Sequence, residues 1–174
     1  MKRKQIVDIS IALCLILIGI LLLVLPLFKV TNINYLSIIV FGFYTILNAI
    51  QFILTIDSKD YEGLYSAIAS LIVLLATIFI KESTPRFLAL ELMTWITLMA
   101  LAKLKKMDYY HDRRDRMWKL RVFNLVFFVL AGLLTSINLS YSSEVQIIVL
   151  GFFMLIHGML EIFDPIVKTL IAHS

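Results

Sequence analysis

Four polar side chains within otherwise apolar runs have the types and spacing that proton chemistry requires. His157 and Glu161 are four residues apart, so on a helix they share one face and can pair. Asn48 and Gln51 share a face in another apolar run. Histidine is the side chain whose charge changes most readily near neutral pH. The four residues therefore predict a half-channel or a proton-responsive site, with His157 as the titrating group.

Hydrogen bonding between helices is the structural alternative for the same four residues. Such bonds contribute about 0.6 kcal/mol on average in membrane proteins, which is enough to fix packing without transport. In this interpretation Glu161 and Asp164 simply lie at the membrane interface. Ionisable groups at membrane depth cost roughly a few kcal/mol each, and this cost makes them the first candidates for function.

Three further polar residues lie within or beside apolar runs. Asp8 and Asn124 begin runs on the side where His157 and Glu161 are expected. Glu91 stands alone, about one helical turn from the opposite surface. We expect Glu91 to extend towards the outer head groups and to pair with Arg86. The alternatives for Glu91 are the lining of an outer vestibule or an interface between subunits.

Signals of an enzyme are absent from the sequence. It contains no HExxH, GxSxG, P-loop or glycine-rich dinucleotide turn. His111, His157 and His173 are too scattered to predict a metal site, and the single cysteine, Cys14, allows no internal disulfide. The sequence therefore predicts a protein that is not an enzyme and that binds neither a cofactor nor a metal.

The elements that hold these residues follow from the composition. Of the 174 residues, 61% are hydrophobic and 16% are charged, and the mean hydropathy of +0.95 excludes both a water-soluble globule and a disordered chain. A membrane-spanning helix needs roughly 20 mostly apolar residues. The chain is therefore predicted to be a single all-α transmembrane domain, residues 1–174, surrounded by a lipid bilayer. Its six spans are Ile9–Phe28, Tyr35–Ile56, Gly63–Ile80, Phe87–Ala102, Val122–Leu139 and Val145–Phe163.

Basic residues predict the orientation of the six spans. If both termini are cytoplasmic, 13 of the 16 Lys and Arg residues fall on the inner side and 3 on the outer side. Lysine and arginine are enriched in cytoplasmic loops, so this distribution predicts an N-in, C-in topology.

The basic segment Lys103–Arg121, predicted as a cytoplasmic loop, contains eight Lys and Arg residues. Its first interpretation is a topology anchor near anionic head groups. The alternative is a docking surface for a cytoplasmic protein, and no nucleic acid is expected to bind.

An internal repeat divides the chain into three helical hairpins. Ile38–Phe43 and Ile147–Phe152 are identical at five of six positions, and the preceding helices also align. The predicted repeats cover approximately residues 5–58, 61–105 and 118–165, with a degenerate middle copy. Small residues allow close helix approach in lipid, so glycines at related positions are predicted to mark packing contacts. These glycines are Gly19, Gly42, Gly132, Gly151 and Gly158.

The hairpin unit resembles a known family. A glycine-led apolar helix ends near a proline (Gly19–Pro26), and the following helix carries a central glycine with a small residue seven positions on, as in Gly42–Ala49 and Gly151–Gly158. This pattern is similar to the HdeD-like family of small bacterial inner-membrane proteins built from repeated two-helix units. The resemblance implies an association with acid resistance, but no reaction and no catalytic residues.

The expected function is therefore that of a non-enzymatic inner-membrane protein in stress or acid response, or in envelope homeostasis. One alternative is a subunit of a transporter or channel with a cytoplasm-facing polar site. Another is a membrane partner that docks a cytoplasmic protein through the basic segment. A second copy of the chain and another membrane protein both stay open as partners.

Overall fold

The computed structural model describes residues 3–29, 32–56, 61–80, 85–112, 117–138 and 143–173. These residues form α-helices apart from a short 3-10 turn, η1 (Leu25–Phe28), and a few residues at helix ends. Six of the described helices are long and apolar enough to cross a membrane, which confirms that part of the prediction. The helices are α1 (Arg3–Val24), α2 (Ile33–Thr55), α3 (Glu62–Phe79), α4 (Pro85–Asp112), α5 (Met117–Asn138) and α6 (Ser143–His173).

Local sequence explains how the first two helices are joined. Pro26 falls at the start of the 3-10 turn that follows α1, where its missing N–H removes no helical hydrogen bond. Lys29 then adopts a left-handed conformation with φ of 59°, and its N–H donates to the carbonyl of Pro26 at 3.0 Å. The side chain of Asn32 caps α2 by accepting a hydrogen bond from the N–H of Tyr35 at 3.3 Å.

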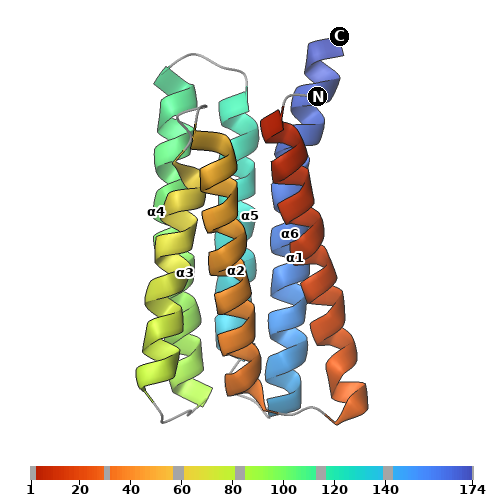
Figure 1. Ribbon diagram of the computed structural model, residues 1–174, viewed down its shortest axis with the longest axis vertical. Helices are drawn as coiled ribbons and strands as arrows, with labels where there is room; N and C mark the ends of the chain where they lie inside the picture. The colour runs from red at the N-terminus through yellow and green to blue at the C-terminus, as the bar shows by residue number, and fades with distance from the viewer. Residues whose placement is uncertain are drawn as a thin grey trace.

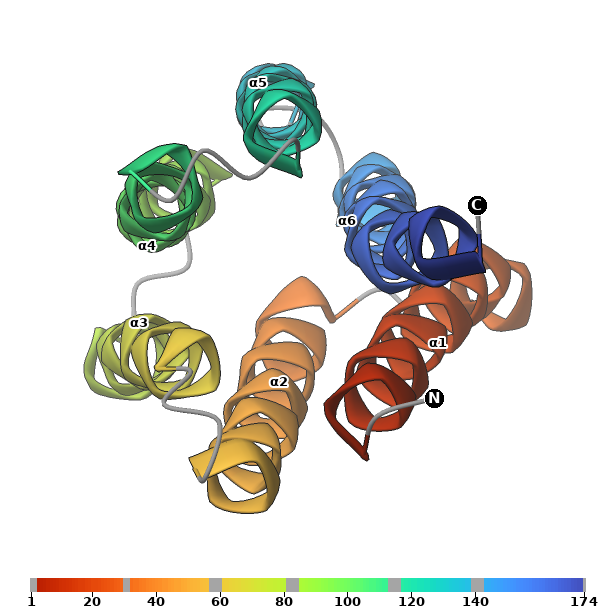
Figure 2. The ribbon, with the colours of Figure 1, turned by 90° about the horizontal axis from the view of Figure 1, so that it is seen from above.

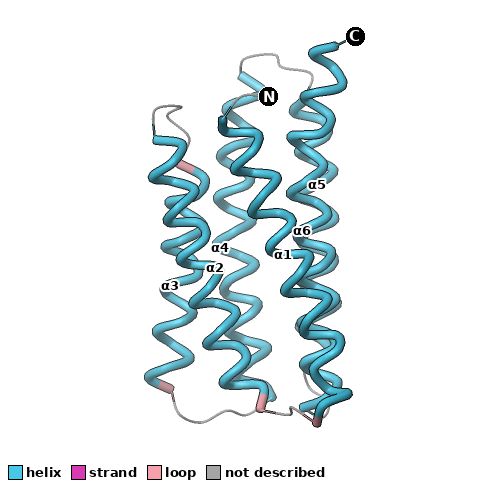
Figure 3. Tube along the Cα trace, turned by 45° about the vertical axis from the view of Figure 1, so that its right-hand side comes forward, coloured by secondary structure: helices cyan, strands magenta, loops and turns pink. Residues whose placement is uncertain are grey.

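The six helices stand in a ring, in chain order, and α6 lies next to α1 to close it (Figure 2). Both ends of the chain lie at one end of this bundle, here named the termini end, and the opposite end is named the far end (Figure 1). The last turns of α6 extend beyond the other helices at the termini end (Figure 3). The closest helix pairs are α1 with α6, α2 with α3, and α4 with α5. The tightest packing therefore lies between the predicted hairpins rather than within them.

Glycines account for the close approach of α1 and α6. A Cβ atom added to Gly19 would lie 2.6 Å from the backbone nitrogen of Leu155, and one added to Gly158 would lie 2.9 Å from the carbonyl oxygen of Ala12. Gly151 faces the backbone of α1 in the same way, with a distance of 3.0 Å to the carbonyl oxygen of Gly19. The backbones therefore touch where only glycine leaves room.

The other two predicted packing glycines differ from each other. A Cβ on Gly132 would meet the side chain of Ile96 at 2.5 Å, so this glycine fits α5 against α4. The nearest atom to a Cβ on Gly42 belongs to the side chain of Leu74, at 3.9 Å, which is ordinary contact. The packing prediction for Gly42 is therefore wrong, because its sequence match to Gly151 does not place it against a neighbouring backbone.

The basic segment Lys103–Arg121 is largely helical, although the sequence predicted a loop. Helix α4 continues through Asp112 and α5 begins at Met117. No glycine or proline interrupts the chain between Lys103 and Asp112, so the helix continues past the end of the apolar run. The apolar run indicated where the membrane-spanning part ends, not where the helix ends.

Trp95 fills the middle of the ring. It is fully buried, and its indole nitrogen donates a hydrogen bond of 2.9 Å to the hydroxyl of Ser70 on α3. Four aromatic rings from α2, α5 and α6 meet the Trp95 ring edge-on, with centroid distances between 5.3 and 6.0 Å. Together these side chains form the aromatic layer: Phe41, Tyr44, Trp95, Phe128 and Phe153.

Candidate functional site

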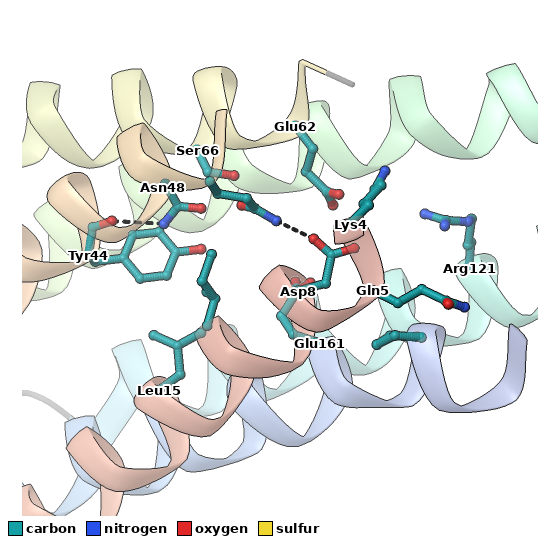
Figure 4. Close-up of a pocket in the computed structure, with 13 residues that line it drawn as sticks. Lys4, Gln5, Asp8, Leu15, Tyr44, Asn48, Glu62, Ser66, Arg121 and Glu161 are labelled. Atoms are coloured by element: carbon teal, nitrogen blue, oxygen red, sulfur yellow. Dashed lines mark hydrogen bonds between the residues drawn. The ribbon is translucent and has the colours of Figure 1, made fainter. Parts of the chain in front are cut away.

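A small polar cavity lies inside the ring at the termini end (Figure 4). Its volume is about 50 Å³, and polar side chains from five of the six helices line it. The remaining helix, α4, contributes Lys103, which pairs with the lining residue Glu161. We name this site the charged chamber; its polar residues are Lys4, Gln5, Asp8, Tyr44, Asn48, Gln51, Glu62, Ser66, Lys103, Arg121 and Glu161.

The charges of the chamber balance. Three basic side chains (Lys4, Lys103 and Arg121) stand among three acidic side chains (Asp8, Glu62 and Glu161). Figure 4 shows Lys4 beside Asp8 and Glu62. Charges inside a membrane protein are tolerated where they pair with one another or face a polar cavity, and both conditions hold here.

Two hydrogen bonds position the amide side chains that the sequence singled out. The Nε2 of Gln51 donates to Oδ1 of Asp8 at 2.7 Å, which joins α2 to α1. The Nδ2 of Asn48 donates to the carbonyl oxygen of Tyr44 at 2.8 Å, within its own helix. Gln51 therefore links helices, whereas the amide nitrogen of Asn48 is satisfied locally and its side chain lines the cavity.

An ion pair crosses the ring between Lys103 of α4 and Glu161 of α6. Both side chains are mostly inside the protein, with 15% and 26% of their surfaces exposed. The ammonium group of Lys103 also lies 5.3 Å from the centre of the Phe128 ring, a distance that allows a cation–π contact. The pair therefore joins the charged chamber to the aromatic layer.

His157 lies directly beneath the charged chamber and is fully buried. Its Nε2 is 3.0 Å from the hydroxyl of Tyr44, and its Nδ1 is 3.8 Å from Oε1 of Glu161. Nδ1 makes no hydrogen bond, so a small movement of Glu161 would complete one. The ring stacks on Phe153 with an interplanar angle of 11°. One imidazole nitrogen thus faces the chamber and the other faces a phenol at the edge of the aromatic layer.

A second cavity, of about 260 Å³, lies at the far end between α2, α3 and α4. Glu91 lines it and is 6% exposed, so its side chain points into the bundle. The prediction that Glu91 extends to the lipid head groups is therefore wrong, and the alternative of a vestibule agrees with this position. The predicted partner, Arg86, has a side chain outside the described residues. We name this site the Glu91 cavity.

The structure brings together most of the residues that the sequence selected. Asp8, Asn48, Gln51 and Glu161 line the charged chamber, and His157 lies beneath it. Asn124 lines a small adjoining recess and donates to the carbonyl oxygen of Leu160 at 3.2 Å, while Glu91 lies apart.

Several residues of the site were not selected from the sequence, among them Tyr44, Glu62, Lys103 and Arg121. Lys103 and Arg121 were counted as charges that fix orientation, although both turn into the bundle. One signal in the sequence could have identified Lys103 as a residue that faces inward. A spacing of four residues along α4 places it on the same side of the helix as Glu91, Trp95 and Met99.

Among the described residues, no group of three or more His, Cys, Asp or Glu side chains is placed to hold a metal ion. Comparison of the chain with models of protein families, with curated proteins and with solved structures found no match. The resemblance to the HdeD-like family therefore stays a prediction.

Proposed function

We propose that this chain is a non-enzymatic membrane protein that translocates protons, with the charged chamber open to the cytoplasm and His157 as the proton-carrying group. One observation carries the proposal. A fully buried histidine lies between the carboxyl group of Glu161 and the hydroxyl of Tyr44, directly beneath a cavity lined by charges. Of the functions that the sequence left open, this favours the transport alternative.

The imidazole of His157 can accept a proton at one nitrogen and release a proton from the other. A proton held by Glu161 can pass to Nδ1 once the 3.8 Å separation closes to hydrogen-bond distance. A proton leaves Nε2 for the oxygen of Tyr44, 3.0 Å away, only when Tyr44 gives up its own hydroxyl proton in the same step to a water molecule that enters as the aromatic layer rearranges. The net result is the movement of one proton from the chamber through the aromatic layer.

The aromatic layer supports gated translocation rather than an open pore. Its rings pack around Trp95, which is fully buried. A proton that reaches Tyr44 can continue only when this packing rearranges. Rearrangements of packed helices occur on microsecond to millisecond timescales, so we expect a slow transporter rather than a fast channel.

We also propose a repeat architecture, a membrane location and a physiological role for the chain. Three tandem hairpins (residues 5–58, 61–105 and 118–165) agree with the alternation of looser contacts within each hairpin and closer contacts between hairpins. The excess of basic residues near the termini end supports a cytoplasmic location for that end and a bacterial inner-membrane location. The HdeD-like resemblance adds an acid-stress role.

The docking alternative has weaker support, because Lys103 and Arg121 turn into the bundle.

The test is the decay of a pH gradient in liposomes that contain the purified protein and an internal pH-sensitive dye. The wild-type protein should dissipate an imposed gradient faster than protein-free liposomes do. His157→Gln keeps a hydrogen-bonding side chain but cannot relay a proton, so we expect the protein-dependent rate to fall by about tenfold or more. Tyr44→Phe removes the neighbouring hydroxyl and should also slow the decay.

His111→Gln is the matched control, because His111 is exposed and lies at the end of α4. It should retain the wild-type rate. A wild-type rate equal to that of protein-free liposomes, or a folded His157→Gln protein with an unchanged rate, would contradict the proposal. The second result would favour a packing role for the polar cluster.

A further inference from the structure

The Glu91 cavity contains a buried acid with no basic partner among the described residues that line the cavity. Glu91 is 6% exposed, and its Oε1 makes no hydrogen bond. No basic side chain occurs among the described residues that line the cavity, and Glu91 is the only acidic one among them. An ionised carboxyl group is purely a hydrogen-bond acceptor, so this oxygen requires a donor or a cation.

The walls of the cavity indicate what kind of cation would fit. Asn32, Asn34 and Thr77 add two amides and a hydroxyl group. Tyr35 and Phe87 add aromatic rings. Most of the remaining lining is aliphatic: Ile38, Ile78, Ile80 and Leu88. A divalent metal ion would need several oxygen ligands converging on one point, and the described lining offers one carboxyl group. Aromatic and aliphatic walls around a single acid instead suit a cation with an apolar body.

The volume limits the size of such a ligand. An engineered protein cavity of about 150 Å³ binds benzene. The Glu91 cavity, at about 260 Å³, is larger and would hold a ligand with a ring and a short amine chain. Its lining residues come from the start of α2, the end of α3 and the start of α4, and these helix ends lie at the far end of the bundle (Figure 1). None of these residues lines the charged chamber.

We infer that the Glu91 cavity is a binding site for a small organic amine in its cationic form. The ammonium group lies against Oε1 of Glu91, and the apolar body lies against Tyr35, Phe87 and the aliphatic wall. This inference does not depend on proton translocation, since the two sites share no lining residue.

Tryptophan fluorescence provides the test. Trp95 lies one helical turn from Glu91 on α4, and Trp118→Phe removes the only other tryptophan. The Trp118→Phe protein in detergent is titrated with 2-phenylethylammonium and, separately, with its neutral analogue 2-phenylethanol. We expect a saturable change in Trp95 fluorescence with the cation, and binding of the alcohol that is weaker by about tenfold or more.

Glu91→Gln, which removes the charge at nearly constant shape, should weaken the binding of the cation by about tenfold or more and leave the alcohol unaffected. Glu144→Gln is the matched control, because Glu144 is an exposed acid in the first turn of α6, also at the far end. It should not change either affinity.

Three results would overturn the inference. The first is equal affinity of the unsubstituted cavity for the cation and the alcohol, which would mean apolar partitioning only and needs no substitution in the cavity to observe. The second is cation binding that Glu91→Gln does not weaken. The third is no saturable binding of either compound.

Discussion

The charged chamber and the Glu91 cavity are polar sites at opposite ends of the same helix ring. They differ in the number of acidic and basic side chains that line them. The chamber is small, at about 50 Å³, and places three acids against three bases. The Glu91 cavity is about five times larger, at about 260 Å³, and holds one acid with no basic side chain among its described lining residues. The described residues of the chamber balance one another's charges, whereas the described lining of the cavity does not balance the charge of Glu91.

A single helix connects the two sites. Glu91, Trp95, Met99 and Lys103 recur every four residues along α4, so they follow one inward face from the far end to the termini end. Trp95 lies between the Glu91 carboxyl group, which has no basic partner among the described lining residues, and the Lys103 ammonium group, which pairs with Glu161. The difference therefore comes from what the neighbouring helices supply at each level of α4.

The largest effect should come from removing one partner of the ion pair in the chamber. Lys103→Ala leaves the Glu161 carboxyl group in a mostly buried site without its cation. Such a change in a fully buried pair costs about 3–5 kcal/mol, and partial exposure reduces this to about 3 kcal/mol. The measurement is the free energy of unfolding in mixed detergent micelles.

Two further variants sharpen that result. Lys105→Ala, on the exposed side of the same helix, should change the unfolding free energy by about 1 kcal/mol or less. The double variant Lys103→Met with Glu161→Gln should recover most of the loss, because neither partner then carries an uncompensated charge. A Lys103→Ala protein as stable as Lys105→Ala would show that the chamber charges are not balanced by this pair.

A smaller loss should follow from separating α1 from α6, the two helices that hold Asp8 and Glu161 in the same chamber. Gly19→Ala places a methyl group 2.6 Å from the backbone nitrogen of Leu155, so the helices must move apart. We expect a loss of about 2 kcal/mol in unfolding free energy, as for other overpacked sites.

Gly42→Ala is its control, because the nearest atom to the added methyl group is 3.9 Å away. It should leave stability unchanged or raise it by up to about 1 kcal/mol through helix propensity. Equal effects of the two substitutions would contradict the close α1–α6 contact.

The smallest effect should have the opposite sign and occur at the Glu91 cavity. Glu91→Met replaces a buried carboxyl group that has an unsatisfied oxygen by an apolar side chain of similar length. Removing such an unsatisfied group should raise the unfolding free energy by about 1 kcal/mol in the absence of ligand. A destabilisation as large as that of Lys103→Ala would mean that Glu91 has a stabilising partner within the protein.

The sequence predicted the parts of the fold that depend on local hydrophobicity. Six continuous apolar runs sufficed for the six membrane-length helices, because lipid leaves the backbone of each run no alternative but helix. The runs could not indicate the true ends of α4, since a helix continues past the membrane wherever nothing interrupts it. They also could not predict that α1 packs more closely on α6 than on α2, which depends on contacts distant in sequence.

The candidate site was predictable where it consisted of polar residues in apolar surroundings. His157, Glu161 and Gln51 were recognisable for that reason, and they come together as expected. Tyr44 was not, because a tyrosine in an apolar helix has the same pattern whether or not its hydroxyl meets a histidine. Lys103 and Arg121 lie at the ends of apolar runs, where a basic residue that fixes topology and one that turns inward look identical in sequence.

The central claim is that two separate cavities open at opposite ends of the bundle, on either side of the aromatic layer. Its most direct test is thiol accessibility in sealed vesicles of known orientation, with Cys14→Ala as the background. Gln51→Cys reports on the charged chamber and Thr77→Cys on the Glu91 cavity. A membrane-impermeant thiol reagent should label Gln51→Cys only from the side of the chain termini and Thr77→Cys only from the other side. Labelling of both positions from the same side would contradict the account.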